Sequence, residues 1–114
     1  MRVVNLSKGT TLAQEVEEAR SYWARLVGLL GRRGLAEGHG LLIAPCSSVH
    51  TLFMRFAIDV AFLDSDGRVV RAYASVPPFR LLMGGPGARM ALELPAGTLE
   101  RSGTRAGDFL QLQP

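Results

Sequence analysis

Short apolar runs, each stopped after a few residues by glycine, proline or aspartate, dominate this sequence. The chain has 114 residues, of which 13 are glycine and 6 are proline. Because these residues punctuate the chain so closely, most runs are too short for helices and have the length of β-strands. The runs that we expect to form strands span residues 3–6, 11–16, 41–44, 49–56, 58–63, 68–76, 89–94 and 108–112.

A single segment has a clear helical pattern. Apolar side chains recur at helical spacing over residues 21–30, Ser21 is a suitable N-cap, and Gly31 is suited to end the helix. Bending the sheet removes exposed strand edges that so few helices cannot cover. We therefore expect one domain over residues 1–114 with an α+β, mainly β fold. It would be a strongly bent sheet or partly closed barrel of seven or eight short strands, with one packed helix at about 21–30.

Composition excludes several classes of protein. Hydrophobic residues make up 47% and charged residues 20%, which is typical of a globular domain rather than a disordered chain. The single cysteine, Cys46, cannot form an internal disulfide, which indicates a reducing compartment. The N-terminal apolar run is too short for a signal peptide, and no window approaches the ~20 apolar residues of a membrane span. We expect a soluble, cytoplasmic protein without a membrane partner.

The charge pattern argues against nucleic-acid binding. The formal net charge is +3 and the sequence pI is about 9.8. The basic residues are twelve arginines and one lysine, and they are scattered along the chain without interleaved aromatic residues. The common nucleotide, zinc-protease and serine-hydrolase motifs are missing from the sequence, so we expect no cofactor and favour a non-enzymatic role.

Motif residues are densest in residues 46–70, and further motifs flank this segment on both sides. They are Arg25, Gly28, Leu29, Cys46, Val49, His50, Thr51, Met54, Arg55, Ile58, Asp59, Phe62, Leu63, Asp64, Gly67, Val69, Val70, Glu93, Leu94, Pro95, Ala96, Gly97, Gly107 and Asp108. With this combination and spacing, the chain resembles the uncharacterised family known as domain of unknown function 192, and in particular members with both a cysteine and a histidine in the central segment. The resemblance covers nearly the whole chain and implies a compact, strand-rich α+β fold. It implies no reaction, because no activity is established for that family.

The central segment is the predicted site. In a strand over residues 49–56, His50 would share one face with Leu52, Met54 and Phe56, and both faces would be largely apolar. Polar side chains are costly to bury among apolar ones unless they are paired. We therefore expect Arg55 and Asp59 to form an ion pair, and both to converge with His50 on a shared hollow.

The long irregular stretch at residues 77–88 is predicted to be a mobile loop beside this hollow. Arg80 lies in that loop and could close over a ligand together with Arg55. The leading hypothesis is a binding or accessory domain that holds a small anionic ligand or a partner's peptide segment. The predicted ligand-binding residues are His50, Thr51, Arg55, Asp59 and Arg80.

Two other interpretations stay open. Cys46 and His50 could act as nucleophile and base in a hydrolase or transferase, although a fully extended chain would hold them roughly 13 Å apart. A zinc site would need three or four ligands, and the candidates are only His39, Cys46, His50 and Asp59, without a second cysteine or a pair of histidines. We therefore expect no metal site. The second open interpretation is a structural interaction module, either a monomer or a homodimer formed through an exposed strand edge.

Overall fold

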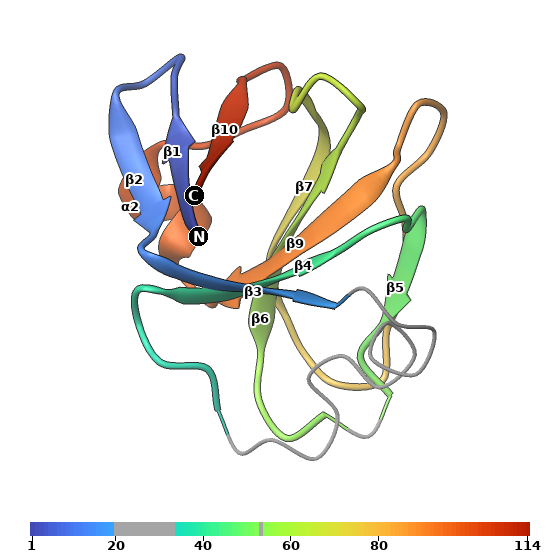
Figure 1. Cartoon of the computed structure of the whole chain (residues 1–114). Helices are drawn as coiled ribbons and strands as arrows, with labels where there is room; N and C mark the ends of the chain where they lie inside the picture. The colour runs from blue at the N-terminus through green and yellow to red at the C-terminus, as the bar shows by residue number, and fades with distance from the viewer. Residues whose placement is uncertain (20–33, 53) are drawn as a thin grey trace.

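A computed structural model of the chain describes residues 1–19, 34–52 and 54–114. Its described strands are β1 (Arg2–Asn5), β2 (Thr10–Ala13), β3 (Glu15–Ala19), β4 (His39–Ile43), β5 (Ser48–His50), β6 (Ile58–Leu63), β7 (Val69–Val76), β8 (Leu81–Met83), β9 (Met90–Pro95) and β10 (Leu110–Gln113). A short helix, α2 (Thr98–Ser102), lies between β9 and β10. The strands form three sheets, in the orders β10-β1-β2, β3-β4-β9-β6-β7 and β5-β8 (Figure 1).

The five-stranded sheet forms the centre of the molecule. Its strand β6 is buried over its whole length, as expected for a strand that is covered on both faces. Successive strand residues face opposite sides, so Phe62 packs in one apolar cluster and Leu63 in another. The first cluster includes Val49 of β5 and Leu82 of β8, and the second includes residues of β1, β2, α2 and β10. The two smaller sheets therefore cover opposite faces of β6, and Figure 1 shows β1, β2, β10 and α2 gathered on the side away from β5.

The α+β, mainly β class is confirmed, and the sheets are not closed into a barrel. The predicted hairpin at residues 64–67 is present, since β6 and β7 pair antiparallel across it. Gly67 has a φ of 87°, in the left-handed region that glycine adopts without steric cost. A β-carbon at this position would also collide with the backbone carbonyl of Leu110, so both the turn and its neighbour require glycine.

Several boundaries differ from the prediction. The described residues form ten strands rather than seven or eight, partly because residues 11–16 divide between β2 and β3, which join different sheets. The predicted strand 49–56 is wrong beyond His50, where β5 ends. Residues 77–88 contain β8, and α2 was not predicted. The predicted helix at 21–30 lies outside the described residues.

Candidate functional site

The central segment turns at Thr51, which is wholly buried and fixes the chain on both sides. Its N–H donates to the carbonyl of Arg80 at 2.8 Å, and its own carbonyl accepts from the N–H of Phe79 at 3.0 Å. Its hydroxyl donates to the carbonyl of Pro77 at 2.7 Å and accepts from the N–H of Arg80 at 2.8 Å. A turn bond from Met54 N–H to the Thr51 carbonyl then leads the chain out of β5. One threonine therefore anchors residues 77–80, which sequence reasoning treated as mobile.

The pairing of β5 with β8 decides which side chains share a face. Val49 lies opposite Leu82, and both are buried against β6. Neighbouring positions face the other way, so Leu81 and Met83 project outward together with Ser48 and His50. The prediction that residues 46–59 and 77–88 lie together is thereby confirmed. The prediction that Leu52 and Met54 share a face with His50 is wrong, because Leu52 is exposed while Met54 is buried in the core.

Four large apolar side chains around the β5–β8 pair are exposed. Leu52, Phe79, Leu81 and Met83 are exposed by 42% to 71%. Phe79 also has a φ of 65°, a backbone conformation that bulky L-residues avoid. The Thr51 bonds hold the chain in that conformation, so the structure maintains both an exposed aromatic ring and a strained backbone. Such outliers are a reasonable starting point for a functional hypothesis.

Arginines accompany these apolar side chains. Arg55, Arg71 and Arg80 are all exposed, and residues 44–58 and 71–90 contain no aspartate or glutamate at all. Arg71 lies at the edge of β8, where its guanidinium donates to the Met83 carbonyl at 3.3 Å. We call the four apolar side chains, together with Arg71 and Arg80, the β5–β8 surface. It combines positive charge and apolar character without any carboxylate of its own.

The predicted ion pair between Arg55 and Asp59 is wrong. Asp59 is fully buried in β6, and its two carboxylate oxygens accept the backbone N–H groups of Ser75 and Leu99, each at 2.8 Å. Arg55 instead points to solvent. The carboxylate is satisfied by backbone donors distant in sequence, so Asp59 has a structural role. Because Asp59 is fully buried and bonded to the backbone, it does not face a hollow together with Arg55 in the described part of the chain.

The Cys46 and His50 side chains are not joined by a hydrogen bond in the described part of the chain. The Cys46 thiol lies 3.0 Å from the carbonyl of Ser48, to which it donates. Nδ1 of His50 is buried and has no hydrogen-bond partner among the described residues. No three His, Cys, Asp or Glu within residues 1–19, 34–52 and 54–114 form a group that could hold a metal ion. Within these residues, Cys46 and His50 therefore lack the contact that a nucleophile–base pair needs.

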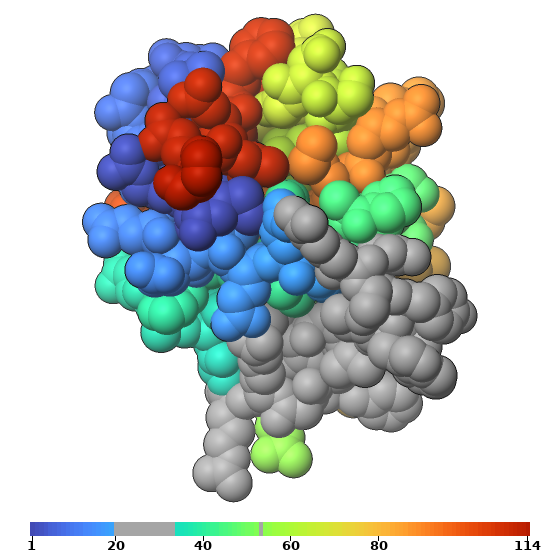
Figure 2. Space-filling view, viewed as in Figure 1, coloured from blue at the N-terminus to red at the C-terminus, as the bar shows by residue number. Residues whose placement is uncertain are grey.

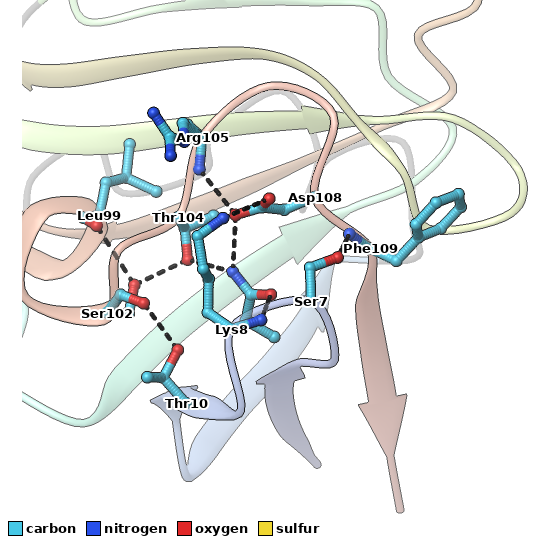
Figure 3. A network of polar contacts seen from close by, with 10 residues as sticks. Ser7, Lys8, Thr10, Leu99, Ser102, Thr104, Arg105, Asp108 and Phe109 are labelled. Atoms are coloured by element: carbon cyan, nitrogen blue, oxygen red, sulfur yellow. Dashed lines mark hydrogen bonds and ion pairs between the residues drawn. The ribbon is translucent and has the colours of Figure 1, made fainter.

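A second polar region, which sequence reasoning missed, connects β1 with the segment between α2 and β10 (Figure 3), on the side of the molecule away from β5 (Figures 1 and 2). Asp108 is buried, and its carboxylate accepts from Lys8 Nζ at 2.7 Å, from Asn5 Nδ2 at 3.0 Å and from the N–H of Arg105 at 3.2 Å. Asn5 also donates to the hydroxyl of Thr104 at 3.0 Å. The Lys8 ammonium, followed by the Asn5 and Arg105 donors, lowers the pKa of Asp108 in opposition to burial. The sequence signal for this region is the Gly107-Asp108 pair, a motif that by itself does not indicate a polar network.

No helix in the described segments is long and apolar enough to span a bilayer. Comparison with solved structures identifies two similar folds. A protein of unknown function from Novosphingobium aromaticivorans superposes with a TM-score of 0.86 at 21% identity, covering 98% of this chain and 84% of that one. A Sinorhizobium meliloti protein superposes with a TM-score of 0.83 at 28% identity, covering 96% of this chain and 89% of that one.

Sequence relatives give the family. A UPF0127 protein of Pyrococcus furiosus is 32% identical over 114 residues, and one of Pyrococcus horikoshii is 34% identical over 115 residues, each alignment covering 96% of both chains. Residues 3–112 match the family model DUF192, described as an uncharacterized ACR. With nearly its whole length matched, the chain belongs to the DUF192 family, a family of unknown function.

Proposed function

We propose that this chain is a binding domain whose β5–β8 surface holds an acidic, apolar segment of another protein. The observation that carries the proposal is the exposure of Leu52, Phe79, Leu81 and Met83 beside arginines, in segments without a carboxylate. Apolar groups that gather on a surface and are rimmed by polar ones are typical of interaction sites. The single cysteine fits a reducing compartment, so the proposal places this binding in the cytoplasm.

Charge determines the kind of partner. Arg71 and Arg80 favour acidic groups, because complementary charge steers encounter and disfavours wrong partners. A second copy of this chain would bring the same arginines together across a two-fold axis, so the surface is poorly suited to a homodimer. The partner we expect therefore carries aspartate or glutamate next to leucine, isoleucine or an aromatic residue.

Phe79 is the expected anchor of this interaction. Aromatic residues that enter a partner's pocket contribute much of the binding energy at protein interfaces. The bonds from Thr51 hold Phe79 in place before the partner arrives, which reduces the entropy lost on binding. Thr51 is thus a positioning residue, Arg71 and Arg80 contact the partner's carboxylates, and His50 lies beside Leu81 on the same face.

The test is a selection of random phage-displayed peptides on the folded protein, followed by affinity measurements on the selected peptides. We expect peptides that combine acidic and apolar residues. Their affinity should fall by about tenfold or more in the Leu81→Ser, Met83→Ser double variant, which corresponds to losing at least about 1.4 kcal/mol. The matched control is Leu6→Ser with Phe109→Ser, which removes two exposed apolar side chains far from the β5–β8 surface and should leave affinity unchanged.

Two other macromolecules are outcomes that would overturn the proposal. The Sinorhizobium meliloti relative carries a provisional name as a transcription regulator. Tight binding of duplex DNA, weakened by Arg80→Gln but not by Leu81→Ser, would assign the arginines to nucleic acid instead. Binding to vesicles containing phosphatidylserine, with peptides failing to compete, would assign the surface to a membrane. Selection of basic peptides, or of none that respond to Leu81→Ser, would reject the proposal directly.

A further inference from the structure

A hollow of about 680 Å³ lies beside the Asp108 network, away from the β5–β8 surface. Its apolar floor comes from Ala72 and Ala74 of β7 and Leu99 of α2. Lys8, Glu100 and Arg105 bring charged side chains to its rim. The volume falls within the range of roughly 300–1,000 Å³ that small-molecule sites occupy. The hollow is therefore large enough for a small ligand and combines an apolar base with charged groups.

Lys8 is held rigidly on this rim. Its Nζ lies 2.7 Å from Oδ1 of Asp108, whose other oxygen is bound by Asn5 and by the backbone of Arg105. An ammonium has three N–H donors, so this ion pair leaves donors for a ligand. The network thus positions a cation at the hollow in advance, and Asp108 lies behind it, buried from solvent.

The Arg105 guanidinium is the second cation. Figure 3 shows the Arg105 side chain directed away from Asp108, while its backbone N–H contacts that carboxylate. Within the described residues the guanidinium has no hydrogen bond or ion pair, and the carboxylate of Glu100 has none either. A ligand entering the hollow would therefore meet two cations, Lys8 and Arg105, and one anion, Glu100.

We infer that this hollow binds a small monoanionic carboxylate with a compact apolar body. The guanidinium fork matches carboxylate geometry, and Lys8 adds a second charged donor. Lys8 is compensated by Asp108, and Glu100 lies opposite Arg105, so the charges around the hollow are nearly balanced, which suits a monoanion held by the guanidinium better than a dianion such as phosphate. The alanine and leucine floor accommodates the apolar body. The site is independent of the β5–β8 surface and of any protein partner bound there.

The test is a titration of the intact protein with benzoate, in which the backbone amide chemical shifts are measured at each benzoate concentration. We expect saturable shifts at Ala72, Ala74 and residues 103–106. Benzamide, the neutral analogue, and inorganic phosphate should both bind more weakly. Arg105→Gln should weaken benzoate binding by about tenfold, as expected from the loss of a charge-assisted contact. This variant keeps the backbone N–H that Asp108 uses, so the fold is preserved, whereas Lys8→Met would leave a buried carboxylate without its cation.

The matched control is Arg89→Gln, which removes an exposed arginine outside the hollow and should leave the benzoate affinity unchanged. Equal weakening in both variants would show diffuse attraction to a basic protein and overturn the inference. Shifts that do not saturate, or that remain the same in Arg105→Gln, would also overturn it. Equal affinity for benzamide would show that the hollow recognises only the ring. None of these results depends on whether peptides bind the β5–β8 surface.

Discussion

Two ends of this molecule differ in whether their polar and apolar groups find partners within the protein. The α2 end, defined by Asn5, Lys8, Asp59, Thr104 and Asp108, matches its buried polar groups with hydrogen bonds from distant parts of the chain. The β5–β8 surface does the reverse, since it leaves large apolar side chains in water and holds Phe79 in a strained conformation. Groups that stabilise a fold are satisfied within it, so the buried network of the α2 end explains stability, and the exposed apolar side chains of the β5–β8 surface are where a protein partner is expected.

The largest predicted effect is on the free energy of unfolding, in a comparison of one substitution at the α2 end with one at the β5–β8 surface. Asp59→Leu removes the acceptor of two backbone N–H groups, and unsatisfied buried donors should lower the free energy of unfolding by about 2–5 kcal/mol in total. Leu81→Ser, on a side chain that is 71% exposed, should change it by no more than about 0.5 kcal/mol. Urea denaturation of both variants measures the difference. Similar losses in the two would mean that the β5–β8 surface is part of the folded core, which would remove the contrast.

Thr51→Val sharpens the contrast, because it affects the support of the surface rather than the surface itself. The valine keeps the size of the side chain but loses the hydroxyl that bonds to Pro77 and Arg80, which should cost about 1–3 kcal/mol. Loss of order should be confined to residues 77–80, measured by hydrogen exchange of their amides. Affinity for a selected peptide should fall in the same variant. Unchanged exchange would show that the turn does not depend on the hydroxyl.

Phe79→Asn separates stability from binding more directly. Asparagine tolerates a positive φ better than phenylalanine, so the substitution should raise the free energy of unfolding by about 1 kcal/mol. Peptide affinity should fall at the same time, because the aromatic anchor is lost. Thermal unfolding and peptide titration of one variant give both values. A variant that lost stability would indicate that the Phe79 ring packs against the protein and is not held outward for a partner.

The sequence predicted the parts of this structure that depend on neighbouring residues. The apolar run at 58–63 and the turn at Gly67 each carry a local signal, and both are present. The partners of Asp59 could not be predicted, because they are backbone groups of Ser75 and Leu99, and any residue type can supply a backbone N–H.

The β5–β8 surface was only partly predictable for a similar reason. A three-residue strand such as β8 has too little length for periodicity to identify it, and it forms because β5 offers it a pairing edge. Treating residues 49–56 as one strand placed His50 and Met54 on one face, whereas the turn at Thr51 separates them. The turn at Thr51 is thus the feature that separates the observed geometry from the predicted one.

The smallest predicted effect is the pH dependence contributed by the α2 end. Lys8, then Asn5 and Arg105, lower the pKa of Asp108 in the folded chain, so the folded state binds its proton less readily than the unfolded state. The stability that Asp108 contributes is therefore fully present above its unfolded-state pKa of about 4 and is lost as the pH falls through the lower folded-state value.

Asp108→Asn should flatten the acid limb of stability against pH, measured by urea denaturation at a series of pH values. Leu81→Ser should keep the wild-type slope, because no titrating group is removed from the β5–β8 surface. Parallel acid limbs for Asp108→Asn and wild type would show that the Lys8–Asp108 ion pair does not stabilise the fold, and the two ends would then differ only in apolar exposure.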